Sequence, residues 1–527
     1  TGTAVSNCIV AFNGTGIRST STSYTVTLSH NDVYGNTTSN YSNITDPTGT
    51  NGNISVDPLL SNPYHDVHTQ PGSPCRDAGN DALVQAGGVD IDGQPRIQGT
   101  HVDIGSDESD GTTWTVPVHT WYVKPTGDDL NNGLSWATAK KTVTVALSAA
   151  GGPDEVWVAG GVYQENITIP AGVALFGGFN GTETALSERN WSTNVTVLDG
   201  FGNNVVTPFP GAVLDGFTVR NGRDGVSVYG TATVSNCNIT GNSSGGVNLY
   251  NSTVIVSNCT IRGNGNGVIV HGDVATVSNC IITGNGDGVL VPGGTVIVSN
   301  CTISGNRDGF RVEGGRAIVS NCTISGNSNG VNVQRGTAMV SNCTISGNSS
   351  YGVYVGFSEA TVSNSIVAFN GRGIRRNSTS YPLTLSFNDV FGNTTANYSN
   401  IIDPTGTNGN ISVDPLFVNR TGNNYRLAAG SPCIDAGSDL IVSPGATDLD
   451  GQPRIHGPHV DMGAYESAGA AGYRWWDVVR ALKISGGMAQ ATLADIALLN
   501  TETFDGGITV RDAIRIARKA AGLDANP

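Results

Sequence analysis

The dipeptide Ser-Asn, usually followed by Cys, returns at a nearly constant interval through the middle of this chain. The spacings between successive copies are 22, 21, 21, 21, 21 and 22 residues. Self-similarity at a fixed period of this length is the signature of a repeat architecture, in which each repeat is one supersecondary unit. The Asn of the dipeptide stands at Asn236, Asn258, Asn279, Asn300, Asn321, Asn342 and Asn364.

One repeat, TVIVSNCTISGNRDGFRVEGG at 295–315, contains three short alternating runs at 296–298, 301–303 and 310–312. Alternation with period two predicts strands that are half-buried on one face. Asn and Gly, which tolerate left-handed backbone, stand between the runs and predict sharp corners. Three strands per coil of about 21 residues predict an all-β solenoid, whose coils stack about 4.8 Å apart. We expect Thr302 and Ser304 to point outward, and an inward set formed by Val298, Cys301, Ile303, Phe310 and Val312.

Composition narrows the class of protein further. Of 527 residues 72 are Gly, yet Gly does not recur at every third position, which excludes collagen. Only 13% of residues are charged, so the chain does not have the composition of a disordered protein. The net charge of −15 argues against a nucleic-acid-binding protein, which needs a basic surface to contact phosphates. No apolar run is long enough to predict a membrane span.

The repeat spacing and the Asn corners over about 200–400 resemble right-handed parallel β-helix proteins of the pectate-lyase-like class. This resemblance implies the fold, and by itself it implies no particular chemistry.

A second similarity joins residues 3–108 to residues 361–466, for example TAVSNCIVAFNGTGI to TVSNSIVAFNGRGI. Each copy closes on GSPC-x-DAG, DGQPRI and HVD-x-G, which resemble the segment that ends many secreted β-helix proteins before an anchoring module (the choice-of-anchor Q type). We therefore expect tandem solenoids: the end and cap of a first one over 1–110, a linker over 111–118, and a complete one over 119–467. A short amphipathic helix over 137–149 is predicted to plug the start of the second.

Residues 468–527 lose the Gly-Asn corners and carry Ala, Leu and Arg at helical spacing. WWDVVRALKISGG and VRDAIRIARKAAGL are similar to each other and resemble a degenerate dockerin, which implies calcium loops, a helical pair and a cohesin-like partner. Calcium needs six to eight oxygen ligands, whereas only two of the implied positions are carboxylates, so we expect weak binding. The resemblance places the ligands of the second loop at Thr501, Thr503, Asp505, Thr509 and Asp512.

Six cysteines occupy one position of successive coils. A ladder of disulfides or metal ligands is one interpretation, and a column of buried small side chains is the other. Coils about 4.8 Å apart exceed the usual Cβ separation of a disulfide, roughly 3.5–4.5 Å, so we favour the buried column. We expect Cys75 and Cys433 to be buried in the caps. The column is Cys237, Cys259, Cys280, Cys301, Cys322 and Cys343.

One corner of four successive coils carries Asn266, Asp287, Asp308 and Asn329. We expect these side chains outward or at the rim, near Arg307. Asp287, Asp308, Arg311 and Glu313 are the candidate catalytic or calcium-binding set, since carboxylates near 5 Å apart suit a retaining glycosidase and an Arg could serve as the base of a lyase. Turn chemistry is the alternative that we favour, because Asp and Asn both suit a left-handed corner before Gly.

The cap loops hold paired aspartates that predict either structural Ca²⁺ or tight turns whose carboxylates pair with Arg96 and Arg454. These are Asp90, Asp92, Asp448 and Asp450. Asp128, Asp129 and Asn131 form a similar candidate. Sequons mark candidate glycosylation sites at Asn13, Asn36, Asn166, Asn190, Asn377 and Asn393.

The outer face is rich in Thr, Ser and Asn and poor in the acids, bases and His that catalysis uses. We therefore expect an extracellular or cell-surface structural or adhesive protein that is not an enzyme, self-associating head-to-tail through the open first coil. A calcium-dependent polysaccharide lyase or glycoside hydrolase is one alternative. Non-catalytic carbohydrate binding through exposed aromatics such as Tyr351 and Tyr354 is another.

Overall fold

The computed structural model describes residues 3–21, 25–62, 66–112, 118–272 and 274–467. They fall into two compact units, of which the first comprises Thr1–His119 with Gly151–Pro153 and the second begins at Thr120. The predicted dockerin-like module, with Thr501, Thr503, Asp505, Thr509 and Asp512, lies outside the described residues. Most of the predicted linker at 111–118 does as well.

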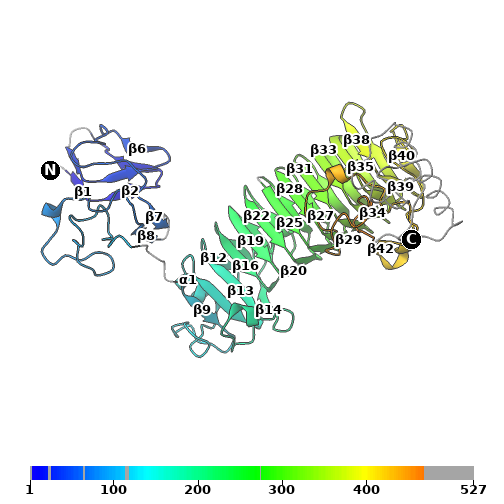
Figure 1. Ribbon diagram of the computed structural model, residues 1–527. Helices are drawn as coiled ribbons and strands as arrows, with labels where there is room; N and C mark the ends of the chain where they lie inside the picture. Colours follow the sequence, from blue (N-terminus) through cyan, green and yellow to red (C-terminus); the bar gives the residue numbers. More distant parts are fainter. Residues whose placement is uncertain (1–2, 22–24, 63–65, 113–117, 273, 468–527) are drawn as a thin grey trace, which may run out of the picture. The chain divides into compact units, whose positions relative to one another are not determined.

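The second unit is a solenoid of stacked coils (Figure 1), and it confirms the predicted all-β fold with three strands per coil. Every strand of a coil pairs in parallel with its equivalent one coil further on, so that Thr295 of one coil lies beside Arg316 of the next. The strands form three sheets that run the length of the unit.

The first sheet takes the strand that precedes each Ser-Asn corner. It contains β9 (Thr120–Val123), β10 (Glu155–Ala159), β13 (Ala174–Phe179), β16 (Ala212–Asp215), β19 (Thr231–Ser235), β22 (Thr253–Ser257), β25 (Val274–Ser278), β28 (Thr295–Ser299), β31 (Arg316–Ser320) and β38 (Leu383–Ser386). The second sheet takes the strand that follows this corner. It contains β11 (Gly161–Tyr163), β14 (Thr196–Asp199), β17 (Phe217–Arg220), β20 (Asn238–Thr240), β23 (Thr260–Arg262), β26 (Ile281–Thr283), β29 (Thr302–Ser304), β32 (Thr323–Ser325), β34 (Thr344–Ser346), β36 (Ile366–Ala368) and β39 (Asp389–Phe391).

The third sheet takes the last strand of each coil. It contains β12 (Ile167–Ile169), β15 (Val206–Pro208), β18 (Val226–Val228), β21 (Gly245–Leu249), β24 (Asn266–Val270), β27 (Asp287–Val291), β30 (Asp308–Val312), β37 (Arg372–Arg376) and β40 (Ala396–Ser399). Two long strands, β33 (Asn329–Ser341) and β35 (Tyr351–Ser363), contribute to both the third and the first sheet.

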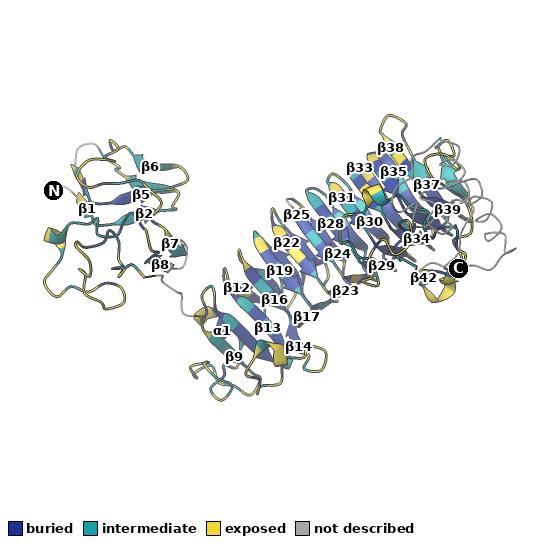
Figure 2. Cartoon of the chain, viewed as in Figure 1, coloured by how far each residue is buried: buried dark blue, intermediate teal, exposed yellow. Residues whose placement is uncertain are grey.

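The core of the solenoid is a continuous stack of the alternating apolar side chains. Val298, Cys301, Ile303, Phe310 and Val312 are all fully buried, as the repeat predicts. Figure 2 shows this burial in dark blue along the strands. The Asn of each Ser-Asn corner has left-handed backbone, with φ between 46° and 54°. A side chain that tolerates this conformation is therefore what each corner requires.

A ladder of hydrogen-bonded asparagines runs beside the core at the Gly-Asn corner, which follows each strand of the second sheet. The sequence predicts only turns at this corner. The Nδ2 of Asn306 donates to Oδ1 of Asn327 at 3.1 Å, and the backbone N–H of Asn306 donates to the same atom at 2.9 Å. Each buried amide thus satisfies the polar groups of the corner below it. The continuous ladder is Asn242, Asn264, Asn285, Asn306, Asn327, Asn348, Asn370 and Asn393.

The six cysteines of the repeat form a buried column, and all nine cysteines of the chain are free thiols. In a typical coil the thiol of Cys301 donates to the carbonyl of Ser299 at 3.2 Å. These thiols therefore behave as small core side chains with a weak local hydrogen bond.

The helix α1 (Val143–Ala149) packs against β9, β10 and β12 and buries Val143, Ala146 and Leu147. The predicted start at 137 was wrong. Asp129 Oδ1 accepts the N–H groups of Lys141 and Thr142, and this fixes them outside the helix. The Thr142 side chain then accepts the N–H of Val145 as the N-cap.

The first unit holds three parallel strand pairs and a hairpin. β1 (Thr3–Ser6) pairs with β4 (Val26–Ser29), β2 (Ile9–Ala11) with β5 (Asp32–Tyr34), and β3 (Thr15–Arg18) with β6 (Ser39–Ser42). The antiparallel hairpin is β7 (Leu60–Asn62) and β8 (Asp66–Thr69), and its counterpart in the second unit is β41 (Phe417–Asn419) and β42 (Asn424–Leu427). Short 3-10 helices lie at Asp81–Leu83, Leu186–Glu188, Arg420–Gly422 and Asp439–Ile441.

The cap of each unit is irregular backbone held by side chains. In both copies a buried cysteine thiol donates to a buried aspartate at 3.2 Å, from Cys75 to Asp32 and from Cys433 to Asp389. The internal duplication therefore reproduces the same contacts in each unit.

Candidate functional site

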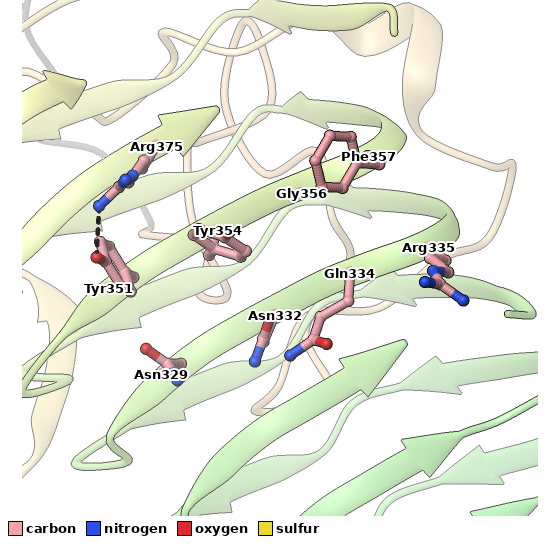
Figure 3. Close-up of a pocket in the computed structure, with 9 residues that line it drawn as sticks. All are labelled: Asn329, Asn332, Gln334, Arg335, Tyr351, Tyr354, Gly356, Phe357 and Arg375. Carbon is pink, nitrogen blue, oxygen red and sulfur yellow. Dashed lines mark hydrogen bonds between the residues drawn. The ribbon is translucent and has the colours of Figure 1, made fainter. Parts of the chain in front are cut away.

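A hollow of about 540 Å³ opens on the outer face of the third sheet, across β33, β35 and β37 (Figure 3). We call it the β33–β35 groove. Its lining side chains come from three successive coils and are mostly amides, aromatics and arginines. They are Asn329, Asn332, Gln334, Arg335, Tyr351, Tyr354, Gly356, Phe357 and Arg375.

The groove lies where the regular turn of the coil is lost. In the coil of β30 the third strand ends at Val312 and a Glu-Gly-Gly turn follows before β31. In the next two coils this turn is replaced, because β33 and β35 each run for 13 residues and pair continuously from Asn329–Tyr351 to Ser341–Ser363. Large side chains such as Phe357, which is 57% exposed, thereby line an extended outer surface.

An aromatic pair and an arginine form one side of the groove. The ring centroids of Tyr351 and Tyr354 lie 5.3 Å apart. Arg375 Nη1 donates to the Tyr351 hydroxyl at 2.8 Å, as Figure 3 shows, and its guanidinium lies 5.6 and 5.9 Å from the two ring centroids. Arg372 lies 5.8 Å from the Tyr351 ring. Cation–π contacts of this kind hold the rings and the guanidinium groups in one arrangement.

Two asparagines form the floor and carry unused acceptors. Asn329 and Asn332 donate their Nδ2 groups to the two oxygens of Asp308, at 2.6 and 2.8 Å. The Oδ1 atoms of both asparagines are buried and accept no hydrogen bond from the described residues. An unsatisfied buried acceptor costs about 1–3 kcal/mol.

The groove is rich in positive charge although the chain carries −15. Arg335 and Arg375 line the groove, and Arg372 and Arg376 stand at the two ends of β37. None of the four forms an ion pair with a described residue. The arginines of the preceding coil, that of β30, differ, because Arg307 and Arg311 are both paired. Guanidinium groups without ion pairs beside the exposed amide of Gln334 suit a ligand that is both anionic and hydroxylated.

The structure brings together the predicted catalytic set, but it corrects where the carboxylates lie. Arg307 donates through Nε and Nη2 to the two oxygens of Asp287, at 3.0 and 2.6 Å. Arg311 pairs with Glu313 at 2.7 Å and lies 4.0 Å from Asp287. Asp287 and Asp308 are only 1% and 2% exposed, so their expected place outward or at the rim was wrong.

The reason is that arginine and asparagine side chains cover these carboxylates. Burial raises the pKa of Asp287, and hydrogen bonding to Asp287 raises the pKa of Arg307. Both oxygens of Asp287 and both oxygens of Asp308 already accept hydrogen bonds. Neither carboxylate offers a free oxygen for a proton transfer, a glycosyl bond or a calcium ion.

The cap loops use their first aspartate to turn the chain. Asp90 accepts the N–H groups of Asp92, Gln94 and Glu108, and Asp448 accepts the three equivalent ones. The predicted pairing with Arg96 and Arg454 was wrong. Asp92 pairs with His68 at 2.8 Å, and Asp450 pairs with Arg426 at 2.5 Å. Both predicted arginines instead donate to backbone carbonyls, and Arg454 also forms a buried ion pair with Glu466 at 3.4 Å.

Among the remaining predicted residues, the carboxylate of Asp129 accepts the backbone N–H groups of Lys141 and Thr142, just before α1. The sequon at Asn393 was wrong as a glycosylation site, because this residue is buried in the asparagine ladder and its Nδ2 donates to the Val367 carbonyl at 2.9 Å. Asn13, Asn190 and Asn377 are exposed, and Asn36 and Asn166 are half-buried.

Residues 194–273 and 266–415 match the family model described as a right handed beta helix region. The repeat region is a right-handed parallel β-helix. This β-helix holds the whole β33–β35 groove. No curated protein matches the sequence significantly. No helix among the described residues is long and apolar enough to span a membrane.

Solved structures with a similar fold include pectate lyase Pel9A, with 18% identity, 66% of this chain and 96% of that chain covered, and a TM-score of 0.46. The alginate lyase from Paenibacillus sp. str. FPU-7 has 14% identity, covers 51% and 99%, and has a TM-score of 0.37. The mannuronan C-5 epimerase AlgE6 A-module of Azotobacter vinelandii has 14% identity, covers 51% and 93%, and has a TM-score of 0.34. The likeness concerns the coil architecture alone.

Proposed function

We propose that this protein is an extracellular adhesive β-helix that binds an anionic polysaccharide in the β33–β35 groove without cleaving it. The observation that carries the proposal is a pair of groove-lining arginines without ion pairs, Arg335 and Arg375, beside an aromatic pair and the exposed amide of Gln334.

The arginines account for the charge of the ligand. A guanidinium binds a carboxylate or a sulfate through two parallel hydrogen bonds, which a neutral sugar cannot accept with the same strength. Arg375 is fixed by the Tyr351 hydroxyl, so part of its rotamer entropy is already lost before binding.

The amide and the rings account for the sugar itself. The amide of Gln334, which lines the groove and is exposed, can exchange hydrogen bonds with the hydroxyl groups of a pyranose. Tyr354 and Phe357 offer apolar surface beside it. The long register of β33 and β35 gives an extended ligand several coils to contact.

A calcium-dependent lyase or glycoside hydrolase has less support in this chain. The candidate acids Asp287 and Asp308 have both oxygens engaged, and the candidate base Arg311 is paired with Glu313. Catalysis needs a group whose reacting atom reaches the substrate. Head-to-tail assembly, the cell-surface location and the cohesin-like partner stay predictions.

The test is calorimetric titration of the whole chain with oligogalacturonate and oligomannuronate, against neutral xylo-oligosaccharides. Arg375→Ala and Tyr354→Ala should each weaken binding of the acidic oligosaccharide by about 10- to 100-fold, the range expected for a charge-assisted hydrogen bond or a buried ring. Arg262→Ala is the matched control, because it removes the same charge from an exposed position on the second sheet. Equal affinity for acidic and neutral sugars would contradict the proposal, and accumulation of unsaturated products would contradict its non-catalytic part.

A further inference from the structure

The two caps of this chain are copies of one another, yet they differ at one cluster of side chains. In the second cap Arg426 pairs with Asp450 through Nε and Nη2, at 2.6 and 2.5 Å, and its guanidinium lies 4.8 Å from the Tyr465 ring centroid. In the first cap the equivalent positions are His68, Asp92 and Asp107. An arginine and a tyrosine are thus replaced by a histidine and an aspartate on the same backbone scaffold.

This replacement converts an ion pair into a set of metal ligands. His68 Nε2 lies 2.8 Å from Asp92 Oδ2 and 4.0 Å from Asp107 Oδ1. One ligand atom from each residue lies within 4.8 Å of the others, and no other His, Cys, Asp or Glu trio in the described ranges gathers so closely. In a tetrahedral site with metal–ligand distances near 2.1 Å, two ligand atoms lie ~3.4 Å apart. The distances from His68 to the two carboxylates bracket this value.

The carboxylate of Asp107 gives an independent reason to expect a cation. Asp107 is 6% exposed. Its Oδ2 accepts the N–H of Thr69 at 3.1 Å, while its Oδ1 faces His68 and accepts no hydrogen bond from the described residues. A buried anion with an open oxygen is costly unless a positive charge compensates it. The tyrosine of the second cap carries no such cost.

The scaffold holds the three residues from three directions. His68 lies on β8, whose Thr69 also anchors Asp107. The Asp92 turn is tied to the loop of Asp107, because Asp90 accepts the N–H of Glu108 and Ile91 donates to Ser106. Hydrogen bonds of the cap therefore tie together the backbone segments that carry the three residues.

We propose that His68, Asp92 and Asp107 bind one divalent transition-metal ion of the zinc type, a site that the second cap lacks. One imidazole and two carboxylates suit Zn²⁺ and leave a fourth position for water. The ion would tie β8 to the two loops of the first cap. This proposal is independent of the β33–β35 groove.

The two caps provide their own matched variants for the test. The whole chain, freed of metal with a chelator, is titrated with Zn²⁺ by calorimetry and with Co²⁺ by visible absorption, with calcium present to fill sites made of oxygen ligands alone. We expect one equivalent to bind and to raise the melting temperature. The double substitution His68→Arg with Asp107→Tyr gives the first cap the residues of the second, and it should weaken Zn²⁺ binding more than tenfold. The reciprocal Arg426→His with Tyr465→Asp should add a second equivalent.

Asp92→Asn, which keeps the shape of the side chain, should also weaken binding and guards against misfolding of the double variant. The melting temperature of each variant without metal reports its fold. Absence of Zn²⁺ and Co²⁺ binding by the unaltered chain would overturn the proposal and reduce the trio to an ion pair like that of Arg426. Equal binding by the unaltered chain and the His68→Arg, Asp107→Tyr variant would overturn it too.

Discussion

Asn306 and Asn327 meet one coil apart through a buried hydrogen bond of 3.1 Å between their side chains. The Nδ2 of Asn306 also donates to the Ile282 carbonyl of the coil below at 3.1 Å. One amide therefore links three coils, and the same arrangement repeats along the ladder. Since each coil touches only its neighbours, such contacts set the interface energy that keeps a solenoid cooperative.

Asn306→Ala should lower the free energy of unfolding by about 1–3 kcal/mol, because the buried N–H of Asn285 and the carbonyl of Ile282, both in the preceding coil, lose their hydrogen bonds to this side chain. Denaturant unfolding followed by circular dichroism measures this. Thr302→Ala, on the outward face of the same coil, is the control and should change stability by less than about 0.5 kcal/mol. Equal effects of the two substitutions would show that the ladder contributes little.

Arg307→Ala should destabilise the β-helix by about 1–3 kcal/mol, because it leaves the carboxylate of Asp287 buried without its bidentate partner. The value is below that for a fully buried pair because the Arg307 side chain is 57% exposed. The loss should shrink as the pH falls, since burial raises the pKa of Asp287 and the group becomes protonated. Chemical denaturation at several pH values measures the trend.

Asp287→Asn in the Arg307→Ala background removes the unpaired charge and should restore most of the lost stability. A double variant that is as unstable as Arg307→Ala alone would locate the effect in lost packing by the arginine stem.

The cap of the second unit should weaken as the pH rises. Burial raises the pKa of Asp461 to about 7 and that of Glu466 to about 8. An acid whose pKa is higher in the folded state holds its proton more tightly there. Its stabilising contribution is complete below the unfolded value, about 4, and is lost as the pH rises through the folded values. Hydrogen exchange of the cap amides measures this at roughly pH 5, 7 and 9, values chosen to lie below, within and above the range in which the two acids titrate.

Glu466→Gln should make exchange in that cap less dependent on pH, because the side chain then carries no titrating proton. The first cap offers an internal comparison, since burial raises the pKa of the equivalent Glu108 to about 7. A pH profile that is unchanged in Glu466→Gln would assign the weakening to Asp461 and its neighbours instead.

The strands and corners of a coil could be predicted from the sequence because each depends on residues that are close together in the chain. Period-two alternation fixes Ile303 and Phe310 as inward, and the Asn300 corner follows from its side chain. The asparagine ladder could not be separated from turn chemistry, since the Gly-Asn dipeptide is typical of both. Its one signal was the 21-residue recurrence of that dipeptide. The burial of Asp287 depends on how Arg307 of the next coil folds over it, which no local pattern specifies.

The groove was predictable only in part for the same reason. Tyr351 and Tyr354 stand out as exposed aromatics in the sequence. Their relation to Asn332 and Arg375 depends on the loss of a turn in two successive coils and on cross-strand neighbours 20 or more residues apart. The cap contacts of Asp92 with His68 and of Asp450 with Arg426 join segments 24 residues apart, so no local pattern in the sequence specifies them.

The cysteine column should report unfolding of the β-helix. Cys237, Cys259, Cys280, Cys301, Cys322 and Cys343 are at most 2% exposed, so a thiol reagent can reach them only when coils separate. With Ellman's reagent under native conditions we expect Cys8, which is half-buried in the first unit, to react faster than the column. Addition of denaturant should release the six column thiols in one transition that coincides with the loss of circular dichroism. Labelling of the column well before that transition would mean that the stack opens coil by coil, as a linear repeat with weak interfaces does.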